Sequence, residues 1–572
     1  MSGAVSGADA VLAGLDPDQR AIAETLAGPV VVRAGAGTGK TRAITHRIAY
    51  GVRTGVYAPD RVLAVTFTRK AAGELQGRLR DLGADGVKAR TFHGAALAQL
   101  SFFWPQVVGG DAPQILNGKV PVLAQAAESL GMRLSTDTLR DVAFEIEWRK
   151  VSRLDLDTYA AKIGERPALN GLTPETLVDM HAKYGQILEE RRQIDFEDVL
   201  VLLSGMLEVE PRVAMQVREQ YRFFTVDEFQ DVSPLQYELL KLWLGNRNDL
   251  CVVGDASQTI YSFAGASSDY LLGFSSDFRN AREFRLERNY RSTAPIVAAA
   301  NRLMKQRPGA LQLRPMRGAP ETPSGTETLE ATAAQVFAPG FEWFSTDIDE
   351  AQAVAASVAA AIRSGTAPSD IAVLARTNAQ LVRIEEALAR QGAQSQVRGG
   401  QRFFDRADVK RAVLLLRGEA KTGDPRPLFQ VVSDALRAGG WTSQPPEGAA
   451  ERESWEALNA LLGLVDEMPA GTTIREFADE LVARQRSQHE PKVEAVTLSA
   501  VHAAKGLEWS LVHVIGMSEG MFPINYAQDE AAIEEERRLC YVALTRARDR
   551  LFLSGSRQSG SAPSRFIAEA GI

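Results

Sequence analysis

The sequence predicts an α/β fold that consists of two units with parallel sheets, each interrupted by a helical insertion. Short β-branched runs recur toward both ends of the chain, and each is followed by a turn and then by a helical pattern. Continuous apolar strands that alternate with helices are typical of parallel sheets covered on both faces. Two intervening stretches, residues 100–195 and 417–494, instead have apolar residues at helical spacing.

The apolar runs place the expected strands. They are residues 30–33, 62–67, 223–226, 250–253, 371–375, 495–499, 511–515 and 551–554. In the stretch 100–195, Leu177, Met180, Tyr184 and Ile187 recur at helical spacing, which predicts an all-α insertion. Residues 305–345 contain five prolines, so we expect an irregular connection there.

The composition excludes several classes of protein. A length of 572 residues suggests about four domain-sized units. The apolar share of 45% and the charged share of 24% exclude wholesale disorder and coiled coil. Two cysteines, Cys251 and Cys540, cannot form a disulfide framework or a four-cysteine metal site. The formal net charge of −7 argues weakly against a protein that coats nucleic acid through bulk charge.

The sequence shows no targeting segment. The first five residues have no basic region that leads into an apolar stretch, and no run of 18 apolar residues occurs. We therefore expect neither a signal peptide nor a membrane span, and a cytoplasmic location.

A phosphate-binding loop is indicated at residues 34–41, which follow an expected strand and open a helix. Its three glycines let backbone N–H groups turn toward phosphate oxygens at a helix N-terminus. Lys40 is expected to reach the β- and γ-phosphates, and Thr41 to hold Mg²⁺. Ala34 stands where the strict pattern has glycine.

An acidic pair is expected at the end of another strand. Asp227 and Glu228 directly follow the run 223–226. In this position Asp227 is expected to bind Mg²⁺, directly or through water, and Glu228 to orient or deprotonate the attacking water. Together with the phosphate loop, the pair predicts an enzyme that hydrolyses a nucleoside triphosphate.

Further motifs indicate which kind of enzyme this is. In chain order they are residues 16–19, 66–72, 91–94, 195–198, 253–263, 286–293, 399–404, 501–509 and 535–547. Together with the two phosphate-site elements, they closely resemble the ordered motifs of UvrD/Rep/PcrA-type superfamily 1 DNA helicases.

The resemblance implies two RecA-like domains, each with a helical insertion, and ATP in the cleft between them. The implied boundaries are 1–100 and 195–285 for the first RecA-like domain, 101–194 for its insertion, 286–416 and 495–572 for the second RecA-like domain, and 417–494 for its short insertion. The implied activity is ATP-dependent movement along single-stranded DNA from 3′ to 5′, with duplex unwinding, in DNA repair or recombination. Expected partners are single-stranded DNA, 3′-tailed duplex DNA and repair proteins, and the expected cofactors are ATP and Mg²⁺.

The resemblance also implies roles for individual residues. Gln19 is expected to read the adenine edge, Tyr290 to stack on adenine, and Glu508 to hold a ribose hydroxyl. Gln258 is expected to sense the γ-phosphate, and Arg291 and Arg546 to reach it as arginine fingers. The implied catalytic residues are Lys40, Asp227, Glu228, Gln258, Arg291 and Arg546. The implied nucleotide-binding residues are Gln19, Ala34, Gly35, Ala36, Gly37, Thr38, Gly39, Lys40, Thr41, Arg42, Tyr290 and Glu508, and the implied metal ligands are Thr41 and Asp227.

A DNA groove lined by aromatic and hydroxyl side chains is expected as well, because bases stack on aromatic rings without regard to sequence. The implied DNA contacts are Phe67, Thr91, His93, Tyr261 and Phe263, any of which could instead be ordinary core residues. Residues 61–93 and 376–411 each carry four more basic than acidic residues. They could hold phosphates locally in an otherwise acidic protein, or they could be helices with mixed solvated faces.

The sequence departs from the family in three places. Ala264 stands where an arginine is common, which puts that phosphate contact in doubt. The short second insertion resembles an actinobacterial branch of the family, and we expect no C-terminal module after the last motif. Two alternatives to a helicase stay open: a single-strand translocase that strips bound proteins with little unwinding, and an ATP-switched DNA-binding repair scaffold.

Overall fold

The computed structural model describes residues 8–166, 169, 172–317, 337–398, 404, 407–422, 424, 426–444, 455, 457–459, 461–469, 471–487, 494–525, 527–560 and 562–572. Residues 399–403 of the expected motif 399–404 lie outside this part. The chain divides into two compact units. The first contains residues up to Gly35, Gly39–Glu287 and Pro308–Leu311, and the second contains Ala36–Thr38, Arg288–Arg307 and the residues from Gln312 onward.

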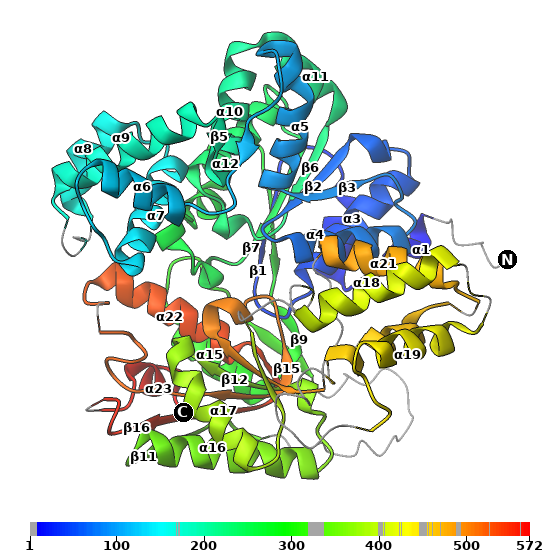
Figure 1. Ribbon diagram of the computed structural model, residues 1–572, viewed down its shortest axis with the longest axis vertical. Helices are drawn as coiled ribbons and strands as arrows, with labels where there is room; N and C mark the ends of the chain where they lie inside the picture. The colour runs from blue at the N-terminus through cyan, green and yellow to red at the C-terminus, as the bar shows by residue number, and fades with distance from the viewer. Residues whose placement is uncertain are drawn as a thin grey trace. The chain divides into compact units, whose positions relative to one another are not determined.

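The first unit is built on a six-stranded sheet with the strand order β3-β2-β6-β7-β1-β8 (Figure 1). In chain order its strands are β1 (Val30–Ala34), β2 (Val62–Thr66), β3 (Lys88–Thr91), β6 (Phe223–Val226), β7 (Leu250–Gly254) and β8 (Arg282–Leu286). Neighbouring strands pair in parallel, for example Val31 with Val252. All carboxyl ends therefore meet at one edge of the sheet.

Helices cover both faces of this sheet. Val30 and Val32 pack with α2 (Pro17–Glu24), α3 (Lys40–Arg53) and α4 (Arg69–Asp81), whereas Val31 packs with the opposite group. That group contains α5 (Phe92–Val107), α10 (Phe196–Val209), α11 (Pro211–Gln220) and α12 (Pro234–Leu244). Successive side chains of a strand point to opposite faces. A continuous apolar strand is therefore the sequence that a sheet buried on both faces requires.

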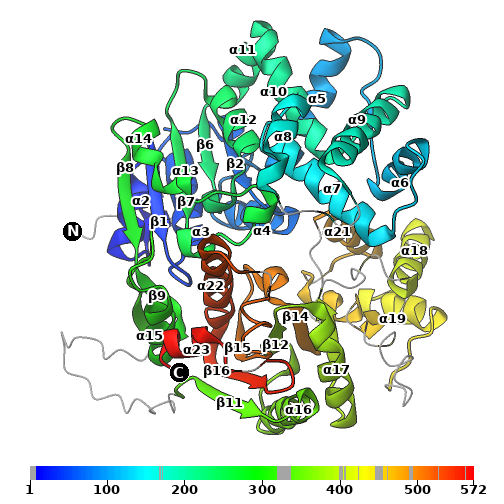
Figure 2. The ribbon, with the colours of Figure 1, turned by 90° about the vertical axis from the view of Figure 1, so that its left-hand side faces the viewer.

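Residues between α5 and α10 form a separate helical layer with its own core. It consists of α6 (Val120–Ser129), α7 (Thr136–Val151), α8 (Leu156–Lys162) and α9 (Pro174–Glu190). In both views these helices lie to one side of the sheet of the first unit (Figures 1 and 2). The prediction of an all-α insertion was wrong in one detail, because β4 (Gln114–Ile115) and β5 (Gln193–Ile194) pair as a short parallel ribbon.

The second unit is built on another six-stranded parallel sheet, with the order β11-β16-β15-β12-β14-β13. Its strands are β11 (Gly340–Phe344), β12 (Ile371–Ala375), β13 (Ser395–Arg398), β14 (Val496–Ala500), β15 (Trp509–Val514) and β16 (Ala547–Ser556). Helices α16 (Asp347–Arg363) and α17 (Leu381–Arg390) pack on one face. Helix α22 (Glu530–Leu544) lies on the other side of the sheet (Figure 2).

Four shorter elements complete this unit. Strands β9 (Arg288–Thr293) and β10 (Arg314–Arg317) form a parallel ribbon, and α15 (Ala294–Leu303) follows β9. Helix α23 (Arg565–Ala570) packs near α15. The expected irregular connection at 305–345 was therefore wrong for β10 and β11; residues 318–336 of it lie outside the described part.

A second helical layer has a core of its own within the second unit. Its helices are α18 (Ala407–Thr422), α19 (Leu428–Ala438) and α21 (Ile474–Ser487). The resemblance implies a boundary between residues 416 and 417, where the short insertion begins. Helix α18 spans this position without a break. Among the described residues, no helix is both long and apolar enough to cross a membrane.

Candidate functional site

The loop between β1 and α3 is shaped by glycines. Gly37 and Gly39 have φ angles of +69° and +79°, a region that side chains with a Cβ adopt only with strain. A Cβ added to Gly39 would lie 2.6 Å from Nε2 of Gln19. The structure therefore brings Gln19, expected to read adenine, against the phosphate loop. Arg42, one turn further along α3, donates from Nη2 to the carbonyl oxygen of Gly14 over 2.9 Å.

The acidic pair lies at the carboxyl end of β6. Burial, with a further contribution from the adjacent Glu228 carboxylate, raises the pKa of Asp227 to about 7, and Lys40 opposes this rise. Nζ of Lys40 lies 3.6 Å from Oε2 of Glu228. Glu228 has the left-handed angles φ +53° and ψ +43°. Such strain costs on the order of 1–3 kcal/mol for a residue other than glycine, and it is typical of functional sites.

The residues around this pair suit a magnesium ion that is bound together with a phosphate group. Asp227 is buried, so its carboxylate gains from a nearby cation. Thr41 is the second residue of α3 and supplies a hydroxyl beside the phosphate loop. Mg²⁺ in such sites takes one or two protein oxygens and completes its shell with water and phosphate. No cluster of three or more metal-ligating His, Cys, Asp or Glu side chains occurs in the described residues.

Gln230 joins the acidic pair to the next strand, a link that the sequence did not indicate. Its Nε2 donates to Oε2 of Glu228 over 2.5 Å, and its Oε1 accepts from the backbone N of Asp255 at 3.0 Å. Oδ2 of Asp255 in turn accepts from Nε2 of Gln258 at 2.7 Å. The expected base and the expected γ-phosphate sensor are thus the ends of one hydrogen-bonded chain in the first unit.

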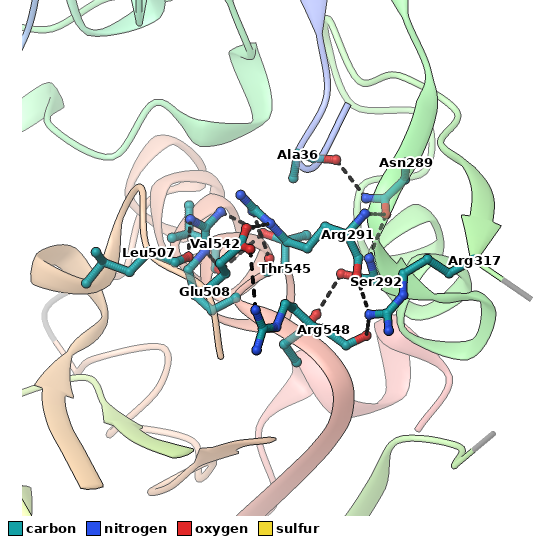
Figure 3. Close-up of polar contacts among 12 residues, drawn as sticks. Ala36, Asn289, Arg291, Ser292, Arg317, Leu507, Glu508, Val542, Thr545 and Arg548 are labelled. Carbon is teal, nitrogen blue, oxygen red and sulfur yellow. Dashed lines mark hydrogen bonds and ion pairs between the residues drawn. The ribbon is translucent and has the colours of Figure 1, made fainter. Parts of the chain in front are cut away.

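The tip of the phosphate loop, Ala36–Thr38, groups with the second unit. The carbonyl oxygen of Ala36 accepts from Nδ2 of Asn289 at 2.7 Å (Figure 3), and that of Gly37 accepts from the backbone N of Tyr290 at 2.9 Å. A Cβ on Gly37 would lie 2.6 Å from Cβ of Arg291. Tyr290 is 41% exposed, and its stacking on adenine stays a prediction. Asn289 lies in an expected motif but was not singled out there.

The two expected arginine fingers differ in their surroundings. Nε of Arg291 lies 2.5 Å from Oε2 of Glu508 (Figure 3). Arg546 is 1% exposed and donates to three oxygens of its own unit: Nε to Val542 O, Nη1 to Leu507 O, and Nη2 to Thr545 Oγ1. These bonds tie the segment before β15 to the end of α22. The γ-phosphate role of Arg546 stays a prediction.

Three of the expected DNA contacts form one aromatic cluster in the first unit. Phe67 stacks on Tyr261 at a ring-centroid distance of 5.2 Å and an interplanar angle of 16°. Tyr261 meets Phe263 edge-on at 6.1 Å. Phe67 is 41% exposed and Phe263 is 55% exposed, so these rings are not core residues. Ala264 ends the short helical turn that follows Tyr261.

The other two expected DNA contacts are occupied by protein partners. Oγ1 of Thr91 accepts from the backbone N of Gly94 at 3.0 Å and caps α5. His93 stacks on Phe196 at 4.0 Å, and burial lowers the pKa of His93 to about 4. Phe196 is exposed and extends this pair to the surface. It lies in an expected motif, but its place beside His93 has no signal in the sequence.

Two parallel-sheet units, one with a phosphate loop and an acidic pair at the carboxyl edge of its sheet, define a RecA-like P-loop nucleotide hydrolase. The family model of the UvrD/REP helicase N-terminal domain matches residues 15–279 of this chain. The model of the UvrD-like helicase C-terminal domain matches residues 284–445 and 428–558. The chain belongs to the UvrD/Rep helicase family.

Named relatives agree with this assignment. The chain is 43% identical over 585 residues to the ATP-dependent DNA helicase UvrD2 of Mycobacterium tuberculosis, covering 98% of this chain and 82% of the relative. It is 27% identical over 655 residues to the ATP-dependent DNA helicase PcrA of Staphylococcus aureus, covering 98% and 87%. The likeness to a mycobacterial protein fits the expected actinobacterial branch.

Proposed function

We propose that this protein is an ATP-dependent DNA helicase that moves from 3′ to 5′ on single-stranded DNA and unwinds duplex DNA during repair or recombination. One observation carries the proposal: β6, which Asp227 and Glu228 directly follow, lies between β2 and β7 in the sheet. Phe67 follows β2, and Tyr261 follows β7. The hydrolytic pair and the two stacked rings therefore come from three adjacent strand ends of one unit.

The proposed chemistry assigns one task to each group. Lys40 and the backbone of the phosphate loop bind the triphosphate, and Thr41 and Asp227 hold the Mg²⁺ that neutralises charge on it. Glu228 accepts a proton from water as the water oxygen bonds to the γ-phosphorus. The bond from that phosphorus to the bridging oxygen breaks, and ADP leaves with its electron pair. Gln19, Tyr290 and Glu508 bind the nucleoside, and Arg291 and Arg546 stabilise charge on the phosphoryl group.

Coupling to DNA is proposed to run through the Glu228–Gln230–Asp255–Gln258 chain. Tyr261 follows Gln258 by three residues, so a change at the γ-phosphate that shifts Gln258 also shifts the ring that stacks on Phe67. Stacking on such rings is worth about 1–3 kcal/mol per base, which is enough to hold a strand during a step. The proposed partners are single-stranded DNA, 3′-tailed duplex DNA and repair proteins, in the cytoplasm.

The test is steady-state ATP hydrolysis with and without single-stranded DNA. We expect strong stimulation by DNA in the wild-type chain and loss of turnover in Lys40→Ala. Equal rates with and without DNA would reject the proposal. A parallel assay measures displacement of streptavidin from a single strand. Displacement without any duplex unwinding would favour the translocase alternative, and DNA binding without either activity would favour the scaffold alternative.

A further inference from the structure

The guanidinium of Arg291 forms an ion pair with the carboxylate of Glu508 (Figure 3). Nε of Arg291 lies 2.5 Å from Oε2 of Glu508, and Nη1 of Arg291 donates to the carbonyl oxygen of Thr545 over 3.3 Å. The pair joins β9 to the residue just before β15, and both residues belong to the second unit.

The backbone of Arg291 is fixed at the tip of the phosphate loop. Oδ1 of Asn289 accepts from the backbone N of Arg291 at 3.0 Å, while Nδ2 of Asn289 donates to Ala36 O. The carbonyl oxygen of Arg291 accepts from Nη1 of Arg317 at 2.8 Å. The side chain therefore starts beside the loop that binds phosphate, and its charged end is drawn to Glu508.

We propose that Glu508 makes hydrolysis depend on the sugar of the nucleotide: it holds Arg291 until a ribose hydroxyl takes the carboxylate, and only then is Arg291 released to the phosphates. The proposal rests on the proposed function, in which ATP binds at the phosphate loop and Glu508 accepts the ribose. It makes Glu508 a specificity-determining residue, which selects nucleoside triphosphates over a bare triphosphate that would fit the same loop.

Arg548 is placed to compensate Glu508 when Arg291 leaves. Its Nη1 lies 3.9 Å from Oε1 of Glu508, and its Nη2 donates to Oδ1 of Asp370 over 2.9 Å. Glu508 thus has a cation near each oxygen, so release of Arg291 does not leave the carboxylate uncompensated. Glu508 is also more than one-third exposed, so water screens the Arg291 pair and keeps it weak enough for a sugar hydroxyl to replace it.

The experiment compares hydrolysis of ATP and inorganic tripolyphosphate by the full chain with Mg²⁺ and single-stranded DNA. In wild type we expect ATP to be hydrolysed far faster than tripolyphosphate. In Glu508→Gln we expect a higher KM for ATP and a kcat for tripolyphosphate that rises about fivefold or more. A purely ribose-binding Glu508 would leave tripolyphosphate hydrolysis unchanged, and that result would overturn the inference.

A control variant and a second substrate complete the test. Glu519→Gln breaks a comparable pair in the same unit, Glu519 with Arg565 at 2.8 Å, and is expected to leave both rates unchanged. If Glu508→Gln does not fold, wild type is tested with 2′,3′-dideoxy-ATP: the proposal predicts a lower kcat, whereas a change in KM alone would contradict it. Absence of ATP hydrolysis in wild type would instead reject the proposed function.

Discussion

Nε2 of Gln230 donates a hydrogen bond to Oε2 of Glu228 over 2.5 Å, and Gln230 itself is fully buried. The same side chain holds the backbone of Asp255 on the adjacent strand end. Glu228 adopts a left-handed backbone conformation, and this hydrogen bond holds its carboxylate in place. Gln230 is therefore a positioning residue for the proposed base.

Replacement of Gln230 by alanine is expected to lower kcat for ATP by about 10²-fold, because small displacements of a catalytic group cost that much. The KM for ATP should change little, since Gln230 is not proposed to touch the nucleotide. The control is Gln76→Ala, which removes another glutamine that bridges backbone groups, Val87 O and Ala89 N. Similar kcat values in the two variants would contradict the positioning role.

Removal of an exposed ring from the aromatic cluster is expected to weaken DNA binding. Phe263→Ala should cost about 1–3 kcal/mol of affinity for single-stranded DNA, measured by fluorescence anisotropy at fixed salt. Phe102→Ala removes a ring that is also more than half exposed, from α5 and outside the cluster, and serves as the control. If both variants bind as tightly as wild type, Phe263 does not stack on DNA.

A largely buried ion cluster joins the helical insertion to the start of α10 in the first unit. Nζ of Lys150 in α7 lies 2.8 Å from Oδ2 of Asp195 and 2.6 Å from Oδ1 of Asp198. Lys150→Met removes the cation that contacts both carboxylates, and we expect a loss of about 3 kcal/mol in the free energy of unfolding. Lys241→Met breaks an exposed pair and should cost less than about 1 kcal/mol. Urea unfolding measures both, and equal losses would contradict the account.

Acid is expected to destabilise the protein through buried histidines. Burial, with a contribution from Arg550, lowers the pKa of His513 from 6.5 to about 4. The unfolded chain therefore binds this proton first, and the stability that His513 supports is full above pH 6.5 and is lost as the pH falls toward 4. The loss amounts to about 3 kcal/mol at 1.36 kcal/mol per pH unit.

The check is the melting temperature between pH 7.5 and pH 5 in wild type and His513→Gln. The variant should lose less stability on acidification than wild type. His46→Gln, at a partly exposed ring, should have a smaller effect on the pH dependence of the melting temperature. If the melting temperature of His513→Gln changes with pH as it does in wild type, protonation of this ring does not cause the loss of stability in acid.

The eight strands that were predicted from the sequence are the eight interior strands of the two six-stranded sheets. The four strands at the sheet edges were missed: β3, β8, β11 and β13. An edge strand has one neighbour and is partly exposed, so its sequence need not be a continuous apolar run. Strand β3, for example, contains Lys88 and Arg90 and has no fully buried residue.

The candidate site, too, was predicted only in part from the sequence. The sequence motifs identified Lys40, Asp227, Glu228 and the aromatic residues, because each motif consists of residues that are close together in the chain. The pairing of Arg291 with Glu508 joins residues 217 positions apart, and no pattern in the sequence signals it. The link through Gln230 was also missed, since its two partners belong to separate strand ends that meet only in the folded sheet.

The most direct test of the central claim is unwinding of duplex DNA with a single-stranded tail of either polarity. The account predicts ATP-dependent unwinding of the 3′-tailed duplex, little unwinding of the 5′-tailed duplex, and none by Lys40→Ala. Equal unwinding of both substrates, or unwinding of the 5′-tailed duplex alone, would contradict it.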